Sequence, residues 1–164
     1  MGKLKPDYYF DTVFQVPYEE LWDNNIRGLI FDIDNTLAAY EDTRPPAKVI
    51  ALIKRLKNMG FSCCLLTNNT NKRLKHFDNA LELDGIANAL KPLTRGVNRA
   101  MQITGTNKAQ TAIIGDQLLS DIWAGKNTGI TTILVKPLSD KDLAFVHVKR
   151  LIERWLLRKY SLLQ

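Results

Sequence analysis

Two aspartates, Asp32 and Asp34, follow directly after the apolar run Gly28–Phe31, which predicts a buried strand. Their side chains leave the same side of the chain, at the end of a strand where open α/β sheets bind ligands. Two neighbouring carboxylates need a cation such as Mg²⁺, which can then hold a phosphate. A carboxylate can also attack phosphorus and form an aspartyl-phosphate. A strand followed by an Asp/Asn turn has the same pattern, so the pair alone leaves both interpretations open.

Polar side chains also follow three further predicted strands. They are Thr67 and Asn68 after 61–66, Lys91 after the weak run 86–90, and Asp116 and Asp121 after 111–115. Each has an ordinary alternative: Thr67 could cap a helix, Lys91 could be a surface charge, and Asp116 could begin a helix. Their occurrence after successive strands, in this order, favours one shared site.

The order of these residues resembles the four motifs of the haloacid dehalogenase (HAD) superfamily of phosphatases, from about residue 28 to residue 135. The motifs are Asp32-x-Asp34-x-Thr36, Thr67, Lys91 and Gly115-Asp116-x4-Asp121. At finer detail the chain resembles the YqeG family of subfamily IIIA, which is similar to phosphatidylglycerophosphate phosphatases. The segments that carry this finer resemblance are 31–37, 67–69, 114–121 and 132–135.

The resemblance implies a role for each aspartate. Asp32 would be the nucleophile, and Asp34 would be first the general acid and then the general base. A Mg²⁺ cofactor would be held by the Asp32 carboxylate, the Asp34 backbone carbonyl and Asp116. Asp121 would be a further metal ligand or a support for one.

The resemblance also implies how the phosphate is held. Thr67 would donate a hydrogen bond to a phosphoryl oxygen, and backbone N–H groups near Asp34 and Asn68 would help. Lys91 would offset the charge of the phosphate and of Asp32, since a phosphomonoester dianion repels an anionic nucleophile.

Alternating strands and helices predict a doubly wound parallel sheet in a three-layer α/β/α sandwich. The resemblance implies that this is a Rossmannoid fold of the HAD type. A chain of 164 residues predicts one domain over 1–164. The predicted helices span 47–59, 72–81, 94–103 and 118–127, and a fifth strand spans 130–135. The gaps 37–60 and 68–90 are too short for a cap domain. The resemblance therefore implies a capless member, whose open site suits a phosphate carried on something large or held in a surface.

The segment 141–164 predicts a basic amphipathic helix, packed on the domain or extending from it. It carries six basic and two acidic residues, within a net charge of +6. One face has Arg150, Arg154 and Arg158, and another has Val148, Leu151, Ile152 and Trp155. Such a helix can lie on an anionic membrane surface, or it can dock on the sheet with its basic side in water.

Together these features predict a Mg²⁺-dependent phosphatase that converts phosphatidylglycerophosphate to phosphatidylglycerol. The alternative is a phosphatase for a soluble sugar or nucleotide phosphate. The chain has no recognised nucleic-acid module, no secretory signal and no membrane-spanning run. Adjacent Cys63 and Cys64 cannot easily bridge and fit a reducing cytosol. We therefore expect a cytoplasmic protein, with peripheral contact to an anionic membrane left open.

Overall fold

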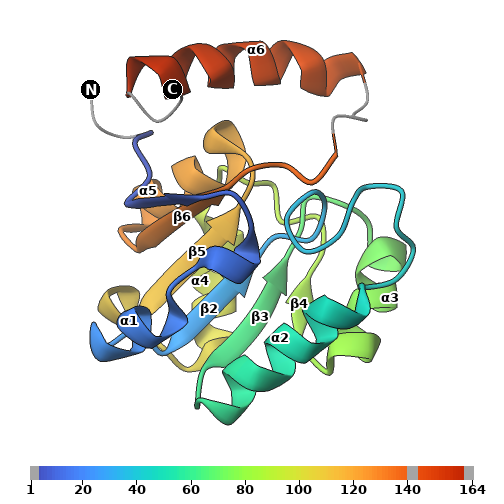
Figure 1. Ribbon diagram of the computed structural model, residues 1–164, viewed down its shortest axis with the longest axis vertical. Coiled ribbons are helices and arrows are strands. Elements are labelled where there is room, and N and C mark those ends of the chain that lie inside the picture. The colour runs from blue at the N-terminus through green and yellow to red at the C-terminus, as the bar shows by residue number, and fades with distance from the viewer. Residues whose placement is uncertain (1–3, 140–143, 161–164) are drawn as a thin grey trace.

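The protein is built around a six-stranded parallel sheet, with strand order β1-β6-β5-β2-β3-β4 (Figure 1). The computed structural model describes residues 4–139 and 144–160, and side chains within 4–139 and 151–160. The strands are β1 (Tyr8–Phe10), β2 (Gly28–Phe31), β3 (Ser62–Leu66), β4 (Gly85–Ile86), β5 (Thr111–Gly115) and β6 (Thr131–Val135).

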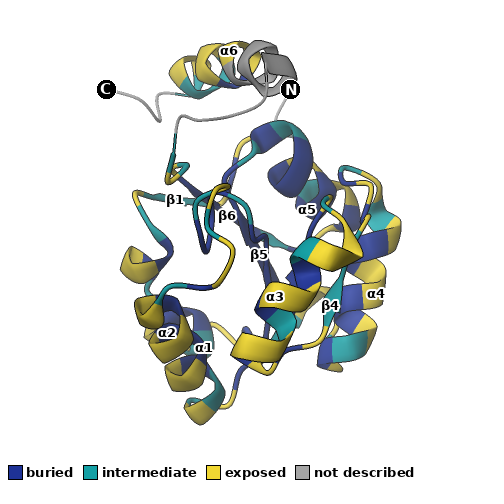
Figure 2. Cartoon of the chain, turned by 90° about the vertical axis from the view of Figure 1, so that its right-hand side faces the viewer, coloured by how far each residue is buried: buried dark blue, intermediate teal, exposed yellow. Residues whose placement is uncertain are grey.

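Helices cover both faces of the sheet. The helices on one face are α1 (Tyr18–Asp23), α2 (Ala47–Asn58) and α3 (Asn71–Leu81), and those on the other are α4 (Thr94–Thr104) and α5 (Trp123–Thr128). The 3-10 turns are η1 (Val13–Gln15) and η2 (Lys108–Gln110), and η3 (Leu118–Ile122) is a π-helix. Figure 2 shows the helices with a buried side toward the sheet and an exposed side outward. This arrangement confirms the predicted three-layer α/β/α fold.

The central strand β2 is apolar throughout because both of its faces are covered. In β2, Leu29 and Phe31 join the core on the α1–α2–α3 face, while Ile30 joins the core on the α4–α5 face. All three side chains are fully buried. Burying a side chain of this size stabilises the fold by about 1.5–3 kcal/mol. A strand that is covered on both faces therefore appears in the sequence as a continuous apolar run.

Local signals set most helix boundaries close to their predicted positions. Helix α2 follows Pro46, as expected from the tolerance of proline in a first turn. Helix α3 is capped by Thr70, whose Oγ1 accepts a hydrogen bond from the Arg73 backbone N–H at 3.4 Å. The alternative role of Thr67 as a helix cap is therefore wrong. Strand β4 covers only the first residue of the predicted weak run 86–90.

The predicted helix 118–127 is divided in two. The backbone N–H groups of Asp121 and Ile122 both donate to the Gln117 carbonyl, at 2.9 and 3.2 Å, and the wider η3 turn results. An ordinary α-helix resumes only at Trp123. Wide turns of this kind are frequent at functional sites, and this one carries Asp121.

Two N-terminal elements, β1 and α1, were not predicted. Strand β1 has three half-buried residues and pairs with β6, which makes it an edge strand. The Asp7 carboxylate accepts hydrogen bonds from Thr132 N and Oγ1, both at 2.8 Å, and so fixes the start of β1 beside β6. A three-residue strand is too short to show a periodic pattern.

Helix α6 (Ala144–Lys159) lies beyond the carboxyl ends of the strands, at the end of the molecule drawn uppermost in Figure 1. Residues 141–143 and 161–164 of the predicted C-terminal helix, and the side chains of Val148 and Arg150, lie outside the described part. Within the described part, residues 32–46 hold no cap domain, and their only regular pairing is a bridge between Asp34 and Ala38. None of the described helices is long and apolar enough to cross a membrane.

Candidate active site

The candidate site lies at the carboxyl ends of β2, β3 and β5. From β2 the chain winds outward to β3 and β4 and then returns to β5 on the other side of β2. Ligands bind at such a switch point in open α/β sheets. A pocket of about 280 Å³ opens here. Its lining includes Asp32, Asp34, Thr67, Asn68, Lys91 and Asp121, all predicted site residues, together with Asn35, Tyr40, Asn69, Gln117 and Ser120.

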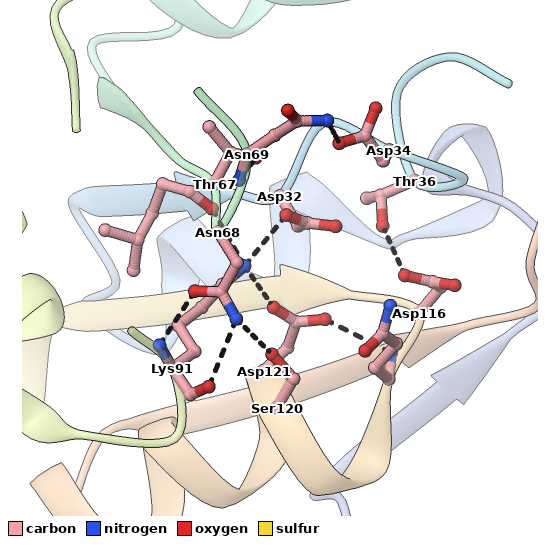
Figure 3. Close-up of polar contacts among 12 residues, drawn as sticks. Asp32, Asp34, Thr36, Thr67, Asn68, Asn69, Lys91, Asp116, Ser120 and Asp121 are labelled. Atoms are coloured by element: carbon pink, nitrogen blue, oxygen red, sulfur yellow. Dashed lines mark hydrogen bonds and ion pairs between the residues drawn. The ribbon is translucent and has the colours of Figure 1, made fainter. Parts of the chain in front are cut away.

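Lys91 links two of the aspartates at the base of the pocket (Figure 3). Its Nζ lies 2.8 Å from Asp32 Oδ1 and 2.5 Å from Asp121 Oδ1, and donates to the Leu66 carbonyl at 2.8 Å. The Lys91 and Asp121 side chains are only 2% and 1% exposed. The sequence-based alternative of Lys91 as a surface charge is therefore wrong.

The charges of this buried group influence one another strongly. Burial raises the pKa of Asp32 to about 7, although the neighbouring Lys91 charge acts in the opposite direction. Burial alone would lower the pKa of Lys91, but the charges of Asp121 and Asp32 raise it above its usual value. Lys91 therefore stays a cation. Whether Asp32 is ionised depends on the charges of the groups next to it.

Three buried carboxylates are close enough to hold a metal ion. Asp32, Asp116 and Asp121 each offer an oxygen atom, and these atoms lie within 4.8 Å of one another. When ionised, the three carboxylates exceed the Lys91 charge by two, which a divalent cation would neutralise. Hard oxygen donors are the ligands that Mg²⁺ prefers. The residues therefore fit the predicted metal.

Backbone and side-chain contacts orient this cluster. Asp121 Oδ2 accepts a hydrogen bond from Gln117 N at 3.1 Å, within the η3 turn. Thr36 Oγ1 lies 3.5 Å from Asp116 Oδ1 and so joins the loop after β2 to the end of β5. Tertiary structure thus brings together two motifs that are far apart in the sequence.

The Asp34 carboxylate lies at the pocket but outside the metal-binding cluster. Its Oδ2 accepts a hydrogen bond from Asn69 Nδ2 at 3.1 Å, and its Oδ1 accepts one from Arg73 Nε at 2.9 Å. The backbone carbonyl of Asp34 as a metal ligand remains a prediction. Arg73 was not identified as a site residue from the sequence, because an arginine in the first turn of a helix is usually a surface residue.

The two polar residues after β3 have different surroundings. Thr67 is buried at the pocket wall, and its Oγ1 accepts a hydrogen bond from Asn69 N at 3.0 Å. The Asn68 side chain instead holds the Lys91 segment: its Oδ1 accepts from Lys91 N at 2.8 Å, and its Nδ2 donates to Lys91 O at 3.1 Å. Asn68 therefore positions Lys91, a role that its place in the sequence does not reveal.

Helix α6 packs against the η3 turn of the site. Leu156 and Leu157 pack on an apolar cluster that includes Leu118 and Ile122. Glu153, which is buried, accepts a hydrogen bond from Leu119 N at 3.0 Å. The helix is thus attached to the turn that carries Asp121.

Comparisons with known proteins agree with this site. A family model described as "Haloacid dehalogenase-like hydrolase" matches residues 39–135, a region that contains Thr67, Lys91, Asp116 and Asp121. The probable phosphatase YqeG of Bacillus subtilis (strain 168) is 32% identical over 152 residues, which cover 93% of this chain and 88% of that protein.

Two more distant proteins are also similar to this chain, one in sequence and one in fold. Phosphatidylglycerophosphate phosphatase 1, chloroplastic/mitochondrial, of Arabidopsis thaliana is 28% identical over 86% of this chain, which spans only 45% of that protein. The cobalt-bound deoxy-D-mannose-octulosonate 8-phosphate phosphatase YrbI of Haemophilus influenzae has a similar fold. Its TM-score is 0.53 at 18% identity, over 80% of this chain and 89% of that chain. The family match and the YqeG relative confirm the resemblance read from the motifs, and the chain belongs to the haloacid dehalogenase-like hydrolase family.

Proposed function

We propose that this hydrolase is a Mg²⁺-dependent phosphatase that cleaves phosphomonoesters through an aspartyl-phosphate at Asp32. The observation that carries the proposal is the contact of Asp32 with Lys91 at the base of the pocket, beside two further buried carboxylates. A nucleophilic carboxylate, a fixed cation and a metal-binding cluster are the groups that phosphoryl transfer needs.

In the first step, an Asp32 oxygen would bond to phosphorus as the bond from phosphorus to the leaving oxygen breaks. Asp34 would protonate the leaving oxygen. In the second step, Asp34 would take a proton from water, whose oxygen attacks phosphorus and releases Asp32 and phosphate. Both carboxylates line the same pocket, as this sequence of steps requires.

Fixed groups around the phosphate would offset its charge. Lys91 is held in place by two carboxylates and by Asn68, so its cation needs no rearrangement during the reaction. The Thr67 hydroxyl can donate to a phosphoryl oxygen. A divalent cation held by Asp32, Asp116 and Asp121 would supply further charge stabilisation.

Phosphate release from phosphomonoesters in the presence of Mg²⁺ tests this proposal. Asp32→Asn keeps the shape of the side chain but removes its negative charge, so release should fall to background. Asp23→Asn, at an exposed position at the end of α1, is the matched control and should keep wild-type activity. Activity of Asp32→Asn above a tenth of wild type would contradict the nucleophile assignment, and full activity in excess EDTA would contradict the metal.

For the substrate, we propose an anionic lipid phosphomonoester, with phosphatidylglycerophosphate first among the candidates. The distant similarity to the Arabidopsis phosphatase supports this choice. So does the absence of a cap domain over the site in residues 32–46, which leaves room for a head group presented at a surface. Fold and motifs define the reaction more closely than the substrate, so a soluble sugar or nucleotide phosphate is the alternative.

The exposed face of α6 also supports a lipid substrate. Leu151, Ile152 and Trp155 are 65%, 49% and 61% exposed, whereas Glu153 on the opposite side of the helix is 6% exposed. Arg154, Arg158 and Lys159 are exposed as well. The helix is therefore docked through its other side and presents apolar and basic groups outward. Each basic residue contributes about 1 kcal/mol of attraction to an anionic lipid surface.

Two measurements test the lipid proposal. A phosphate-release screen should show faster turnover of phosphatidylglycerophosphate than of soluble sugar or nucleotide phosphates. In flotation with phosphatidylglycerol vesicles, wild type should float at low salt and dissociate as salt rises. Arg154→Ala/Arg158→Ala should not float, whereas Lys54→Ala/Lys72→Ala, which removes the same charge from exposed positions on α2 and α3, should. Preference for a soluble substrate without vesicle binding would favour the alternative.

A further inference from the structure

Arg73 lies in the first turn of α3 and binds groups outside its own helix. Its Nε and Nη2 both lie 2.9 Å from Asp34 Oδ1, and the two side chains are only 12% and 17% exposed. Its Nη2 also donates to the Ala39 carbonyl at 3.2 Å, and its Nη1 donates to the Asp42 carbonyl. The guanidinium group lies 4.6 Å from the centre of the Phe77 ring. One side chain thus joins α3 to Asp34 and to the loop that follows it.

These contacts hold Asp34 at both of its oxygen atoms. Arg73 binds Oδ1 and Asn69 binds Oδ2, so the carboxylate can rotate only if one of these bonds breaks. The loop is held too: Ala39 N donates to Asp42 Oδ2 at 3.0 Å, and Arg73 binds the backbone of both residues.

Arg73 does not contact the space where a substrate would lie. The pocket lining includes Asp34, Asn69 and Tyr40 of the held loop, but not Arg73. Its donors point at the carboxylate and at two backbone carbonyls. A direct role in binding phosphate would require Arg73 to give up these contacts.

We propose that Arg73 is a positioning residue, which holds the Asp34 carboxyl group where, in its protonated form, it can transfer a proton to the leaving oxygen. The proposal rests on the acid–base role of Asp34 in the proposed function. Proton transfer depends on closely defined geometry, and a misplacement of about 1 Å can lower a rate by about 10²-fold. Losing Arg73 should therefore impair the steps that need Asp34.

The dependence of the rate on the leaving group separates positioning from a structural role. An alkyl phosphate needs a proton on its leaving oxygen, whereas a nitrophenyl phosphate leaves readily without one. Arg73→Gln should lower kcat/KM for an alkyl phosphate by about 10–10²-fold, but by less than about threefold for 4-nitrophenyl phosphate. The ratio of the two values does not depend on how much of the enzyme is folded, so partial unfolding cannot produce this result.

Matched variants complete the experiment. Arg73→Lys, which keeps the charge but has fewer donors, should recover part of the alkyl phosphate activity. Arg55→Gln removes an arginine from an exposed ion pair with Glu19, and its kcat/KM ratio should equal that of wild type. Asp34→Asn should show the same leaving-group pattern as Arg73→Gln, and the double variant should be no slower than Asp34→Asn alone.

Two results would overturn the proposal while leaving the phosphatase function in place. One is an equal loss for both substrates in Arg73→Gln, and the other is additive losses in the double variant. If Asp34→Asn itself shows no leaving-group pattern, its acid role fails and the positioning proposal fails with it. Loss of activity in Asp32→Asn tests the phosphatase function independently of all these variants.

Discussion

Gly115 and Asp121 are in such close contact that no side chain fits between them. A Cβ atom on Gly115 would lie 2.2 Å from Asp121 Cγ and 2.4 Å from its Oδ2. Asp121 has little room to move, because it is buried and bound to Lys91 and to Gln117 N. The glycine at the end of β5 therefore allows Asp121 to join the metal-binding cluster.

Gly115→Ala should displace Asp121 and lower both the Mg²⁺ affinity and the rate of phosphate release, the rate by about 10²-fold. Calorimetric Mg²⁺ titration and a phosphate-release assay measure the two effects. Gly28→Ala is a matched control at the other end of the sheet, where a Cβ would lie 2.3 Å from Thr106 Oγ1. It should lower the melting temperature but leave the Mg²⁺ affinity unchanged. Equal Mg²⁺ affinities for the two variants would contradict this account of Gly115.

Lys91→Met should destabilise the fold as well as abolish turnover. It leaves the carboxylates of Asp32 and Asp121 buried without their cation, and breaking a buried ion pair in this way costs about 3–5 kcal/mol. Urea unfolding measures this loss, and added Mg²⁺ should recover part of it by binding the carboxylates. Lys126→Met removes a more exposed partner of Asp7 and should cost only about 0–1 kcal/mol. A similar cost for both variants would contradict this view of Lys91.

Metal binding should weaken as the pH falls below about 7. Burial raises the pKa of Asp32 from 3.8 to about 7, so below pH 7 a metal ion must displace a proton from this carboxyl group. The apparent Mg²⁺ affinity should therefore rise with pH through this range and level off above it. Calorimetry at pH 6 in buffers of different ionisation enthalpy should detect proton release in wild type. Asp32→Asn should release none, and equal release in both proteins would point to another group.

Both cysteines should resist alkylation in the folded protein. Burial raises the pKa of Cys63 and of Cys64 to about 12, against 9.0 for a free thiol. At pH 8.5 the folded thiols therefore stay protonated, whereas the unfolded chain exposes a substantial fraction of thiolate. Iodoacetamide labelling followed by mass spectrometry should be slow in buffer and fast in urea. Rapid labelling of the folded protein would show that the thiols are more accessible than the structure indicates.

Much of the site could be predicted because most of its residues directly follow strands that appear in the sequence as apolar runs. The predicted strand 111–115 coincides with β5, because residues 112–114 form an apolar run that is buried on both faces of the sheet. Asp116 follows this strand directly, as Asp32 follows β2. In a parallel sheet the carboxyl ends of the strands lie at one edge, so the order of strands and polar residues was enough to predict a shared site.

The contacts of each side chain depended on tertiary structure. Arg73 binds Asp34 across 39 residues of sequence, and Asn68 binds Lys91 across 23. The sequence around Arg73 and Asn68 does not reveal these partners, because arginine and asparagine are common on protein surfaces.

The outward face of α6 was decided in the same way. The amphipathic pattern predicted a helix with an apolar side, which either the sheet or a membrane could cover. The tertiary structure docks the helix through Leu156, Leu157 and Glu153 and leaves Leu151 and Trp155 exposed. By itself, the sequence determined the fold and the residues that meet at the edge of the sheet, because the order of apolar and polar residues in each strand and helix indicates which positions are buried. Only the tertiary structure determined which of those side chains touch, because contacts between distant segments depend on how the whole chain packs.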